Sequence, residues 1–227
     1  MLAYTSADIL FDPETHTSRL PDGRLVPHVT GILSAVGVST NFEDLAGLSP
    51  RIDAAIRNAA ARGSVVHADC HAYDDDDLDW ATVDPRVRPF DEAWVACRDA
   101  MGFTALAHAR ERRVYHPARG YTGILDGIFV RPATGKTILI DLKTGDPESS
   151  ACHLQMAAYE DAWVLEHPET PIDERWAVWL RPERVIPYTI INYSARPDHW
   201  FDSERFVACL TVYNEQPERR GRVSRVA

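Results

Sequence analysis

An acid and a lysine stand two residues apart at the end of an apolar stretch, where residues 138–145 read I-L-I-D-L-K-T-G. In a β-strand this spacing places Asp141 and Lys143 on one face, and Ile140 and Leu142 on the other. Charged groups at the end of an apolar strand are costly unless they are paired or bind a metal ion. Taken alone, such a pair is more often a simple ion pair than a catalytic one.

A second acid lies in the preceding segment, G-I-L-D-G-I, where Asp126 is flanked by apolar residues and glycines. An antiparallel hairpin of residues 122–131 and 136–143 can bring Asp126 next to Asp141. Two carboxylates held close repel each other unless a cation lies between them, and Mg²⁺ or Mn²⁺ prefers oxygen ligands. With Lys143, the set predicts metal-assisted attack on a phosphodiester, in which the lysine assists a water molecule or stabilises charge.

This arrangement resembles the PD-(D/E)XK nuclease superfamily, in its RecB-like and phage-type exonuclease branch. Asp126 corresponds to the first acidic position of the family, and Asp141 and Lys143 correspond to its (D/E)-x-K pair. The branch also has a Q-x-x-x-Y motif on the next helix, which matches Gln155 and Tyr159 in L-Q-M-A-A-Y.

Two further positions follow from the same resemblance. The branch has a histidine on an upstream helix that joins the metal shell, and His67 in R-G-S-V-V-H matches it. It usually has an acid before the first strand, and Glu111 is the candidate. The resemblance covers about residues 55–165, and V-P-H-V-T-G-I-L upstream is in keeping with phage members.

The resemblance implies a metal-dependent DNA exonuclease that acts in recombination, repair or DNA degradation. It implies Mg²⁺ or Mn²⁺ bound by His67, Asp126 and Asp141, with Lys143 orienting or activating the attacking water. Gln155 and Tyr159 would position the lysine, the metal shell or the phosphate. A structure-specific endonuclease and a non-catalytic DNA-binding or assembly subunit on the same fold remain open as alternatives.

The formal net charge of −10 is unusual for a protein that binds nucleic acid, but it is unevenly distributed. Residues 69–92 alone carry −7. Basic residues gather elsewhere, and we expect the first cluster to contact the DNA backbone: Arg110, Arg112, Arg113 and Arg119. Only Lys136 and Lys143 are lysines among the 24 basic residues. Because arginine is the usual cation of this chain, the lysine at position 143 indicates a requirement that arginine does not meet.

Other metal and motor chemistries are disfavoured by spacing. His67 and His71 have the i, i+4 spacing of zinc ligands, but Ala68 stands where a zinc protease motif has glutamate. Iron–sulfur members of the branch need a late cluster of three cysteines, and only Cys209 lies in that region, so no iron–sulfur cluster is expected. The chain also has no Walker A motif.

The elements that would position these residues follow from periodicity and turn signals. We expect a hairpin around the turn at 21–23, and helices that begin near Thr30 and Pro50. Further helices are expected over 85–101, 150–166 and 197–213, and strands over 112–116, 122–131, 136–143, 174–181 and 187–193. This order predicts an α/β fold, with a mixed central β-sheet flanked by helices (a restriction-endonuclease-like core) and an N-terminal helical elaboration.

We expect a single nuclease domain over residues 1–227, with its core at about 50–215. An N-terminal hairpin and helices would occupy 1–49, and a loose basic tail 217–227. No stretch of about 18 apolar residues and no secretory signal is apparent, so we expect a cytoplasmic protein of a bacterium or a phage-infected host, without membrane contact. DNA is the expected partner, with a homo-oligomer or a recombination protein as further possibilities.

Overall fold

The computed structural model describes residues 4–39 and 49–216. Its centre is a five-stranded sheet in the order β4-β5-β6-β7-β8, and the only parallel pair of neighbours is β6 and β7. The strands are β4 (Thr104–His116), β5 (Tyr121–Arg131), β6 (Lys136–Lys143), β7 (Glu174–Leu180) and β8 (Tyr188–Asn192). The mixed sheet with helices around it confirms the predicted α/β fold class.

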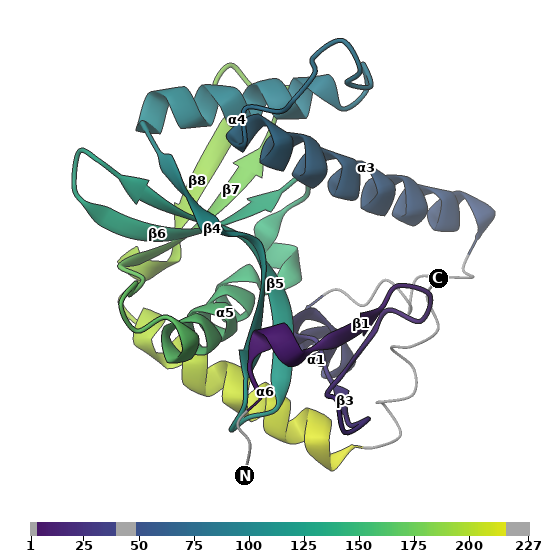
Figure 1. The fold of residues 1–227 in the computed structure, drawn as a ribbon. Helices are drawn as coiled ribbons and strands as arrows, with labels where there is room; N and C mark the ends of the chain where they lie inside the picture. The colour runs from purple at the N-terminus through teal and green to yellow at the C-terminus, as the bar shows by residue number, and fades with distance from the viewer. Residues whose placement is uncertain (1–3, 40–48, 217–227) are drawn as a thin grey trace.

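Helices cover both faces of this sheet (Figure 1). The helices α3 (Pro50–Asp74) and α4 (Arg88–Met101) enclose one apolar cluster, which includes Trp94, Phe129 and Ile140. The helices α1 (Val29–Ala35), α5 (Cys152–Glu166) and α6 (Asp202–Glu215) enclose the other, which includes Tyr121 and Phe206. Helix α5 connects the parallel strands β6 and β7, as a crossover of parallel strands requires.

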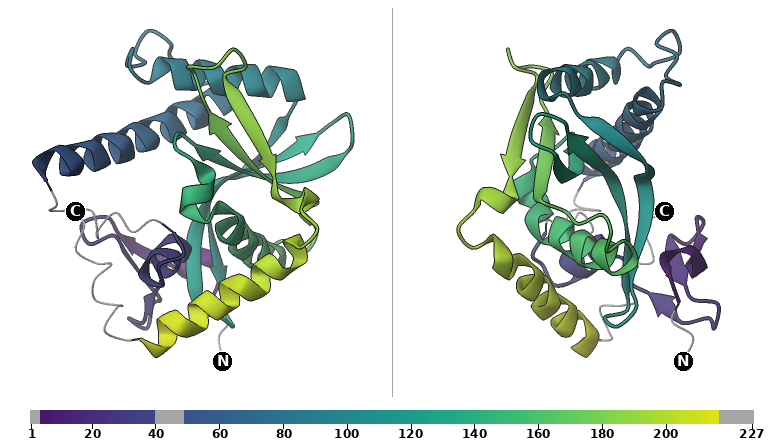
Figure 2. Two further views of the ribbon diagram at one scale, coloured as in Figure 1. Left: turned by 180° about the vertical axis from the view of Figure 1, so that it is seen from behind. Right: turned by 60° about the vertical axis from the view of Figure 1, so that its left-hand side comes forward.

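A small antiparallel sheet precedes the main one. It comprises β1 (Leu10–Asp12), β2 (Thr17–Arg19) and β3 (Leu25–Val26), and a short 3₁₀ helix, η1 (Ser6–Asp8), comes before it. The predicted turn joins β2 to β3, and Gly23 adopts φ 86° there, a conformation that favours glycine. This sheet lies beside the far half of the β4–β5 hairpin (Figure 2) and shares a small apolar cluster with Tyr115.

The expected elements differ from the observed ones mainly at their ends. β6 spans the expected residues 136–143, whereas β4 begins at Thr104, well before the expected residue 112. A 3₁₀ turn, η3 (Tyr193–Ala195), follows β8. The segment expected to begin the last helix at residue 197 forms a second 3₁₀ turn, η4 (His199–Phe201), and α6 starts only at Asp202. A further 3₁₀ turn, η2 (Pro147–Ser150), leads into α5. The predicted basic tail, 217–227, lies outside the described residues.

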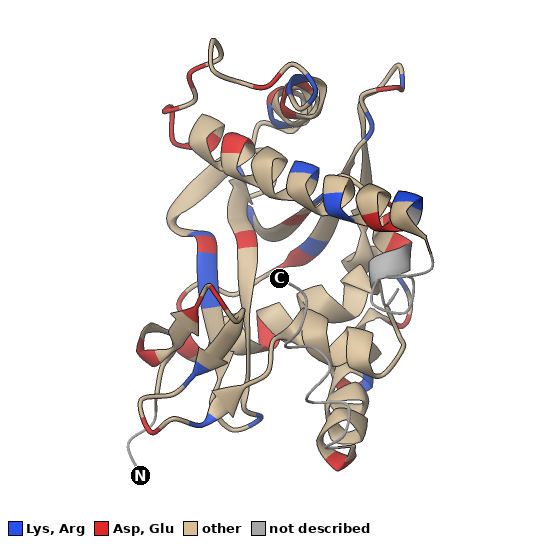
Figure 3. Cartoon of the chain, turned by 90° about the vertical axis from the view of Figure 1, so that its right-hand side faces the viewer, with Lys and Arg blue, Asp and Glu red and all other residues tan. Residues whose placement is uncertain are grey.

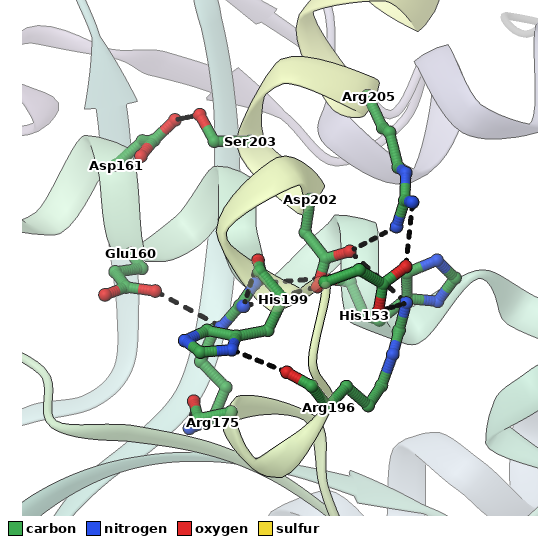
Figure 4. A network of polar contacts seen from close by, with 11 residues as sticks. His153, Glu160, Asp161, Arg175, Arg196, His199, Asp202, Ser203 and Arg205 are labelled. Carbon is green, nitrogen blue, oxygen red and sulfur yellow. Dashed lines mark hydrogen bonds and ion pairs between the residues drawn. The ribbon is translucent and has the colours of Figure 1, made fainter.

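A buried ion network fastens the start of α6 to β7 and α5 (Figure 4). Arg175, at the beginning of β7, contacts Asp202 at 3.2 Å and Glu160 at 3.3 Å. Asp202 is fully buried and also faces Arg196 and Arg205, at 3.5 Å and 3.3 Å. The late start of α6 therefore places its first acidic residue over a buried arginine of the sheet.

Within the described residues, no helix combines the length and the apolar character needed to cross a bilayer.

Candidate active site

Three side chains of metal-binding type converge where α3 passes the β4–β5 hairpin. One potential ligand atom from each of His67, Glu111 and Asp126 lies within 4.8 Å of the other two. Nδ1 of His67 is 3.4 Å from Oδ1 of Asp126. In the described part of the chain, this is the one group of three or more such residues found that close together.

The end of the β5–β6 ladder positions Asp126. The register pairs Gly127 with Ile140, so Asp126 lies one step beyond the last paired residue. Its Oδ2 accepts a hydrogen bond of 2.7 Å from the backbone N–H of Leu142. The carboxylate of Asp126 thus takes the place of the main-chain carbonyl that would accept this hydrogen bond if the β5–β6 pairing continued. One of its two oxygens is fixed by the backbone of Leu142, the residue after Asp141.

A backbone irregularity positions Glu111. The register of β4 against β5 shifts between Ala105 and Arg110, and Glu111 has φ 43°, in the left-handed region. A non-glycine residue is held there at a cost of about 1 kcal/mol or more, so the surrounding strands must enforce it. The positive φ is local to β4 and has no signature in the sequence, which identified Glu111 only through the family resemblance.

Asp141 is the hub of a second, adjoining cluster. Its Oδ2 lies 2.6 Å from Nζ of Lys143 and accepts a hydrogen bond from Sγ of Cys152 at 3.4 Å. Its Oδ1 accepts a hydrogen bond of 3.0 Å from Nε2 of Gln155. The same amide nitrogen is 3.2 Å from the Tyr159 hydroxyl, and Oε1 of Gln155 is 3.4 Å from Nζ of Lys143.

Gln155, on the helix face that carries the Q-x-x-x-Y motif, therefore contacts both Asp141 and Lys143. This contact is compatible with the expected role of positioning the lysine. As expected, Ile140 and Leu142 lie on the opposite face of β6, in the cluster under α3 and α4. Asp141 lies in the lysine cluster, outside the three-residue group at His67, because Lys143, Cys152 and Gln155 occupy its two oxygens. Glu111 takes the third place in that group.

Electrostatics differ sharply between the two carboxylates. Burial is the largest single influence and disfavours the charge of Asp126, but His67, Lys143 and the backbone N–H of Leu142 together outweigh it and hold the pKa of Asp126 below its ordinary value. The contact with Asp126 raises the pKa of His67 to about 9. At Asp141, burial dominates and the pKa is raised despite Lys143. Loss of water around its carboxyl group, and then the charge of Asp126, raise the pKa of Glu111 to about 7.

Lys143 is a cation in this setting. Burial alone would lower its pKa, but Asp141 and, to a lesser degree, Cys152 and Asp126 raise it above the ordinary value of lysine. A protonated ammonium can donate hydrogen bonds and stabilise negative charge, but it cannot take a proton from water. The ammonium form that Asp141 favours suits the orientation of an attacking water, which is one of the two roles expected for Lys143.

A small cavity of about 10 Å³ lies beside the three-residue group. It is lined by His67, Glu111 and Asp126, by His71 and Asp74 of α3, and by apolar side chains of the sheet. This volume is about that needed for a single water molecule or ion. His71 is 3.7 Å from Asp75 and is not part of the three-residue group, so the two histidines of α3 do not form a paired zinc site.

The four arginines expected to bind DNA do not form one surface. Arg110 is ion-paired with Asp75 and is largely buried, and Arg119 is paired with Asp161 at 2.6 Å. Arg113 donates to Ser18 at 3.3 Å and lies over the ring of Phe11. Arg112 is exposed, and no partner of its side chain is found among the described residues. Figure 3 shows basic and acidic residues interspersed along the chain, and Arg110 pairs with Asp75, the residue after α3.

The sequence did not reveal the roles of two sets of residues. Cys152, a buried thiol, was noted only as one of four scattered cysteines, yet it touches Asp141. For the acidic segment 69–92 the sequence showed only its charge, whereas in the structure Asp74 lines the small cavity and Asp75 pairs with Arg110. Both contacts join segments distant in the chain, and neither has a local motif.

Neither a known protein-family model nor any curated protein matches this chain.

Proposed function

We propose that this protein is a metal-dependent deoxyribonuclease, and most specifically a DNA exonuclease, that hydrolyses phosphodiester bonds. The observation that carries the proposal is the close approach of His67, Glu111 and Asp126, next to the cluster that joins Asp141 to Lys143. An acid-rich ligand group alone could bind a cation for structural reasons. A buried lysine next to it, fixed by a carboxylate and an amide, adds a positive charge suited to a phosphate.

The donor set fits the ion that the proposal requires. Two carboxylates and one imidazole suit Mg²⁺ or Mn²⁺, and the imidazole is acceptable to Mn²⁺ in particular. His67, Glu111 and Asp126 would hold the ion, and Asp141 could join them only by giving up a contact to Lys143, Cys152 or Gln155. A bound ion would supply Lewis-acid activation of the phosphodiester.

The side chains of the chain have separate tasks in this proposal. Lys143, as an ammonium, binds a phosphate oxygen or the attacking water and stabilises the charge that develops during attack. Asp141 and Gln155 hold the lysine, and Tyr159 supports the Gln155 amide. The backbone N–H of Leu142 fixes Asp126, so the two clusters move as one unit.

The test is a titration of Mg²⁺ or Mn²⁺ into the protein with end-labelled linear DNA and closed circular DNA. We expect cleavage of linear DNA that requires the metal and stops with excess chelator. Asp126→Asn should abolish it, whereas Asp79→Asn, in the loop before α4, should not. Cleavage that persists in chelator would refute the metal assignment.

The same assay separates the alternatives. Nicking or linearisation of the circle would indicate a structure-specific endonuclease, and DNA binding without cleavage under any metal would indicate a non-catalytic subunit. We further propose that the protein acts in the cytoplasm of a bacterium or a phage-infected host, where DNA ends arise during recombination, repair or degradation.

A further inference from the structure

A second, larger cavity lies at the far end of the β4–β5 hairpin, away from the candidate metal group. Its volume is about 470 Å³, and it is enclosed by β2 and β3, the hairpin turn, the start of α1 and the end of α6. The residues that line it include His16, Arg24, His28, Tyr115, Arg119 and Tyr213. Such a volume falls within the range of small-molecule sites.

The cavity is separate from the candidate active site. None of His67, Glu111, Asp126, Asp141 or Lys143 is among its lining residues. Gly120, at the cavity, lies in the turn just before β5, and Asp126, at the metal group, is the sixth residue of that strand, which corresponds to a separation of roughly 15–20 Å. A ligand here would therefore not be the group that reacts.

The lining has an unusual charge for this protein. The chain has 34 acidic residues and a net charge of −10, yet no aspartate or glutamate is among the described residues that line the cavity. The lining does include two arginines and two histidines. Arg119 is held by Asp161, but Arg24 has only Asp22 as an ion-pair partner, and their side chains are 68% and 37% exposed. Such an exposed pair contributes little and can exchange for a ligand anion.

Tyr115 supplies an unused polar group. The residue is 3% exposed and lines the cavity, and no hydrogen bond of its hydroxyl is found among the described residues. Ser18, another lining residue, bonds Nε2 of His28 at 2.8 Å, which fixes that imidazole at the wall.

We propose that this cavity binds a nucleotide. The wall holds two arginines and no acid, which suits a phosphate, and the Tyr115 hydroxyl and the imidazoles of His16 and His28 suit a base. A nucleoside lacks the anion and inorganic phosphate lacks the ring, so each should bind less well than the whole nucleotide. The inference goes beyond the proposed nuclease activity, because binding at this cavity needs neither the metal nor cleavage.

The experiment is a calorimetric titration of the full chain, in chelator, with deoxyadenosine 5′-monophosphate, deoxyadenosine and inorganic phosphate. We expect the nucleotide to bind at about millimolar concentration or tighter, and at least 5-fold more tightly than either fragment. Arg24→Ala should weaken nucleotide binding about 10-fold, and Tyr115→Phe about 3-fold. Both variants should fold, because Arg24 is exposed and the phenylalanine keeps the ring.

Arg86→Ala is the matched control. Arg86 pairs with an aspartate two residues earlier, as Arg24 does, but it lies far from the cavity in sequence and is not among its lining residues. Its loss should leave binding unchanged. No nucleotide binding, binding no tighter than that of phosphate or nucleoside, or equal weakening by Arg24→Ala and Arg86→Ala would each overturn the proposal.

A further arm identifies the source of the nucleotide. If it belongs to a DNA strand, Arg24→Ala should also weaken binding of a short single-stranded oligonucleotide in chelator. If it is a free nucleotide, oligonucleotide binding should be unchanged while mononucleotide binding falls. Either result supports a nucleotide site, and neither depends on whether the protein cleaves DNA, so failure of the proposed function would be seen separately.

Discussion

At the scale of single residues, Lys143 explains why this arginine-rich chain keeps a lysine. Nζ of Lys143 contacts Oδ2 of Asp141 at 2.6 Å and Oε1 of Gln155 at 3.4 Å, and the side chain is still 20% exposed. An ammonium is compact and can direct its remaining N–H toward a ligand. A guanidinium is broader and planar, and its donors are fixed in one fork, so it would not fit the same space.

The first prediction follows for Lys143→Arg. The charge is retained and the fold should be too, because the side chain lies at the end of β6 and is 20% exposed, but the nuclease rate should fall about 100-fold or more. The measurement is the cleavage rate of linear DNA beside thermal stability for both proteins. Lys136→Arg is the control, since Lys136 pairs with Glu174 at the other end of the same strand. A Lys143→Arg protein that folds and cleaves at the wild-type rate would make Lys143 structural.

At the scale of elements, the packing of α4 on α3 encloses an acid. Asp91 of α4 is 1% exposed, and neither oxygen of its carboxyl group has a hydrogen-bond partner among the described residues. The groups that act on it are Asp69 and Cys70 of α3 and its neighbour Glu92. Burial and then the charge of Asp69 raise the pKa of Asp91 to about 7.

The second prediction is a pH-dependent effect of Asp91→Asn. Because the pKa of Asp91 is raised to about 7 in the folded state, its protonated form stabilises the fold. This contribution is full below about pH 4 and is lost as pH rises from there to about 7. The unfolding free energy of the variant relative to the wild type should therefore rise by about 2–3 kcal/mol between pH 5 and pH 8. Denaturant titrations at both pH values measure this. A difference between the two proteins that is the same at pH 5 and pH 8 would contradict it.

The attachment of α6 gives the third prediction. Asp202→Ala leaves the buried Arg175 without its main partner at this helix, and it should lower the unfolding free energy by about 3 kcal/mol. Asp198→Ala is the matched control, because Asp198 is 44% exposed and pairs with Arg205 on the surface. It should cost less than about 1 kcal/mol. Equal losses from both substitutions would show that burial of the Arg175–Asp202 pair does not matter.

The sequence could predict elements better than contacts. Strand β6 and helix α5 were found because their residue patterns are clear, and the D-x-K spacing located Asp141 and Lys143 on one strand face. Gln155 and Tyr159 were singled out by the family resemblance. The extension of β4 and the positive φ of Glu111 are set by pairing with β5, which no local pattern encodes. The partners of Arg110 and Arg119 could not be predicted for the same reason, because Asp75 and Asp161 belong to other segments.

At the scale of the whole molecule, acidic residues of other segments neutralise arginines of the β4 region. Arg110 and Arg119 have carboxylate partners, Asp75 just after α3 and Asp161 of α5. Among the four arginines of the β4 region, this leaves Arg112 as the exposed cation beside the candidate site. A chain with a net charge of −10 and a polyanion such as DNA repel each other at long range. Binding must therefore depend on a few local contacts.

The last prediction is a weak dependence of DNA affinity on salt. Each neutralised phosphate contributes about −0.9 to the slope of log affinity against log salt, so a protein with one to three contacts should show a slope of about −1 to −3. We would measure it by fluorescence anisotropy with a labelled oligonucleotide in chelator, from about 50 to 200 mM salt. Arg112→Ala should make the slope shallower by about 1, because its contact is lost. Arg119→Ala should leave the slope unchanged, since that guanidinium is held by Asp161. A slope steeper than about −5 would mean that the arginine pairs open on DNA or that the arginine-rich residues after 217 bind it, and the internal neutralisation argued here would not govern binding.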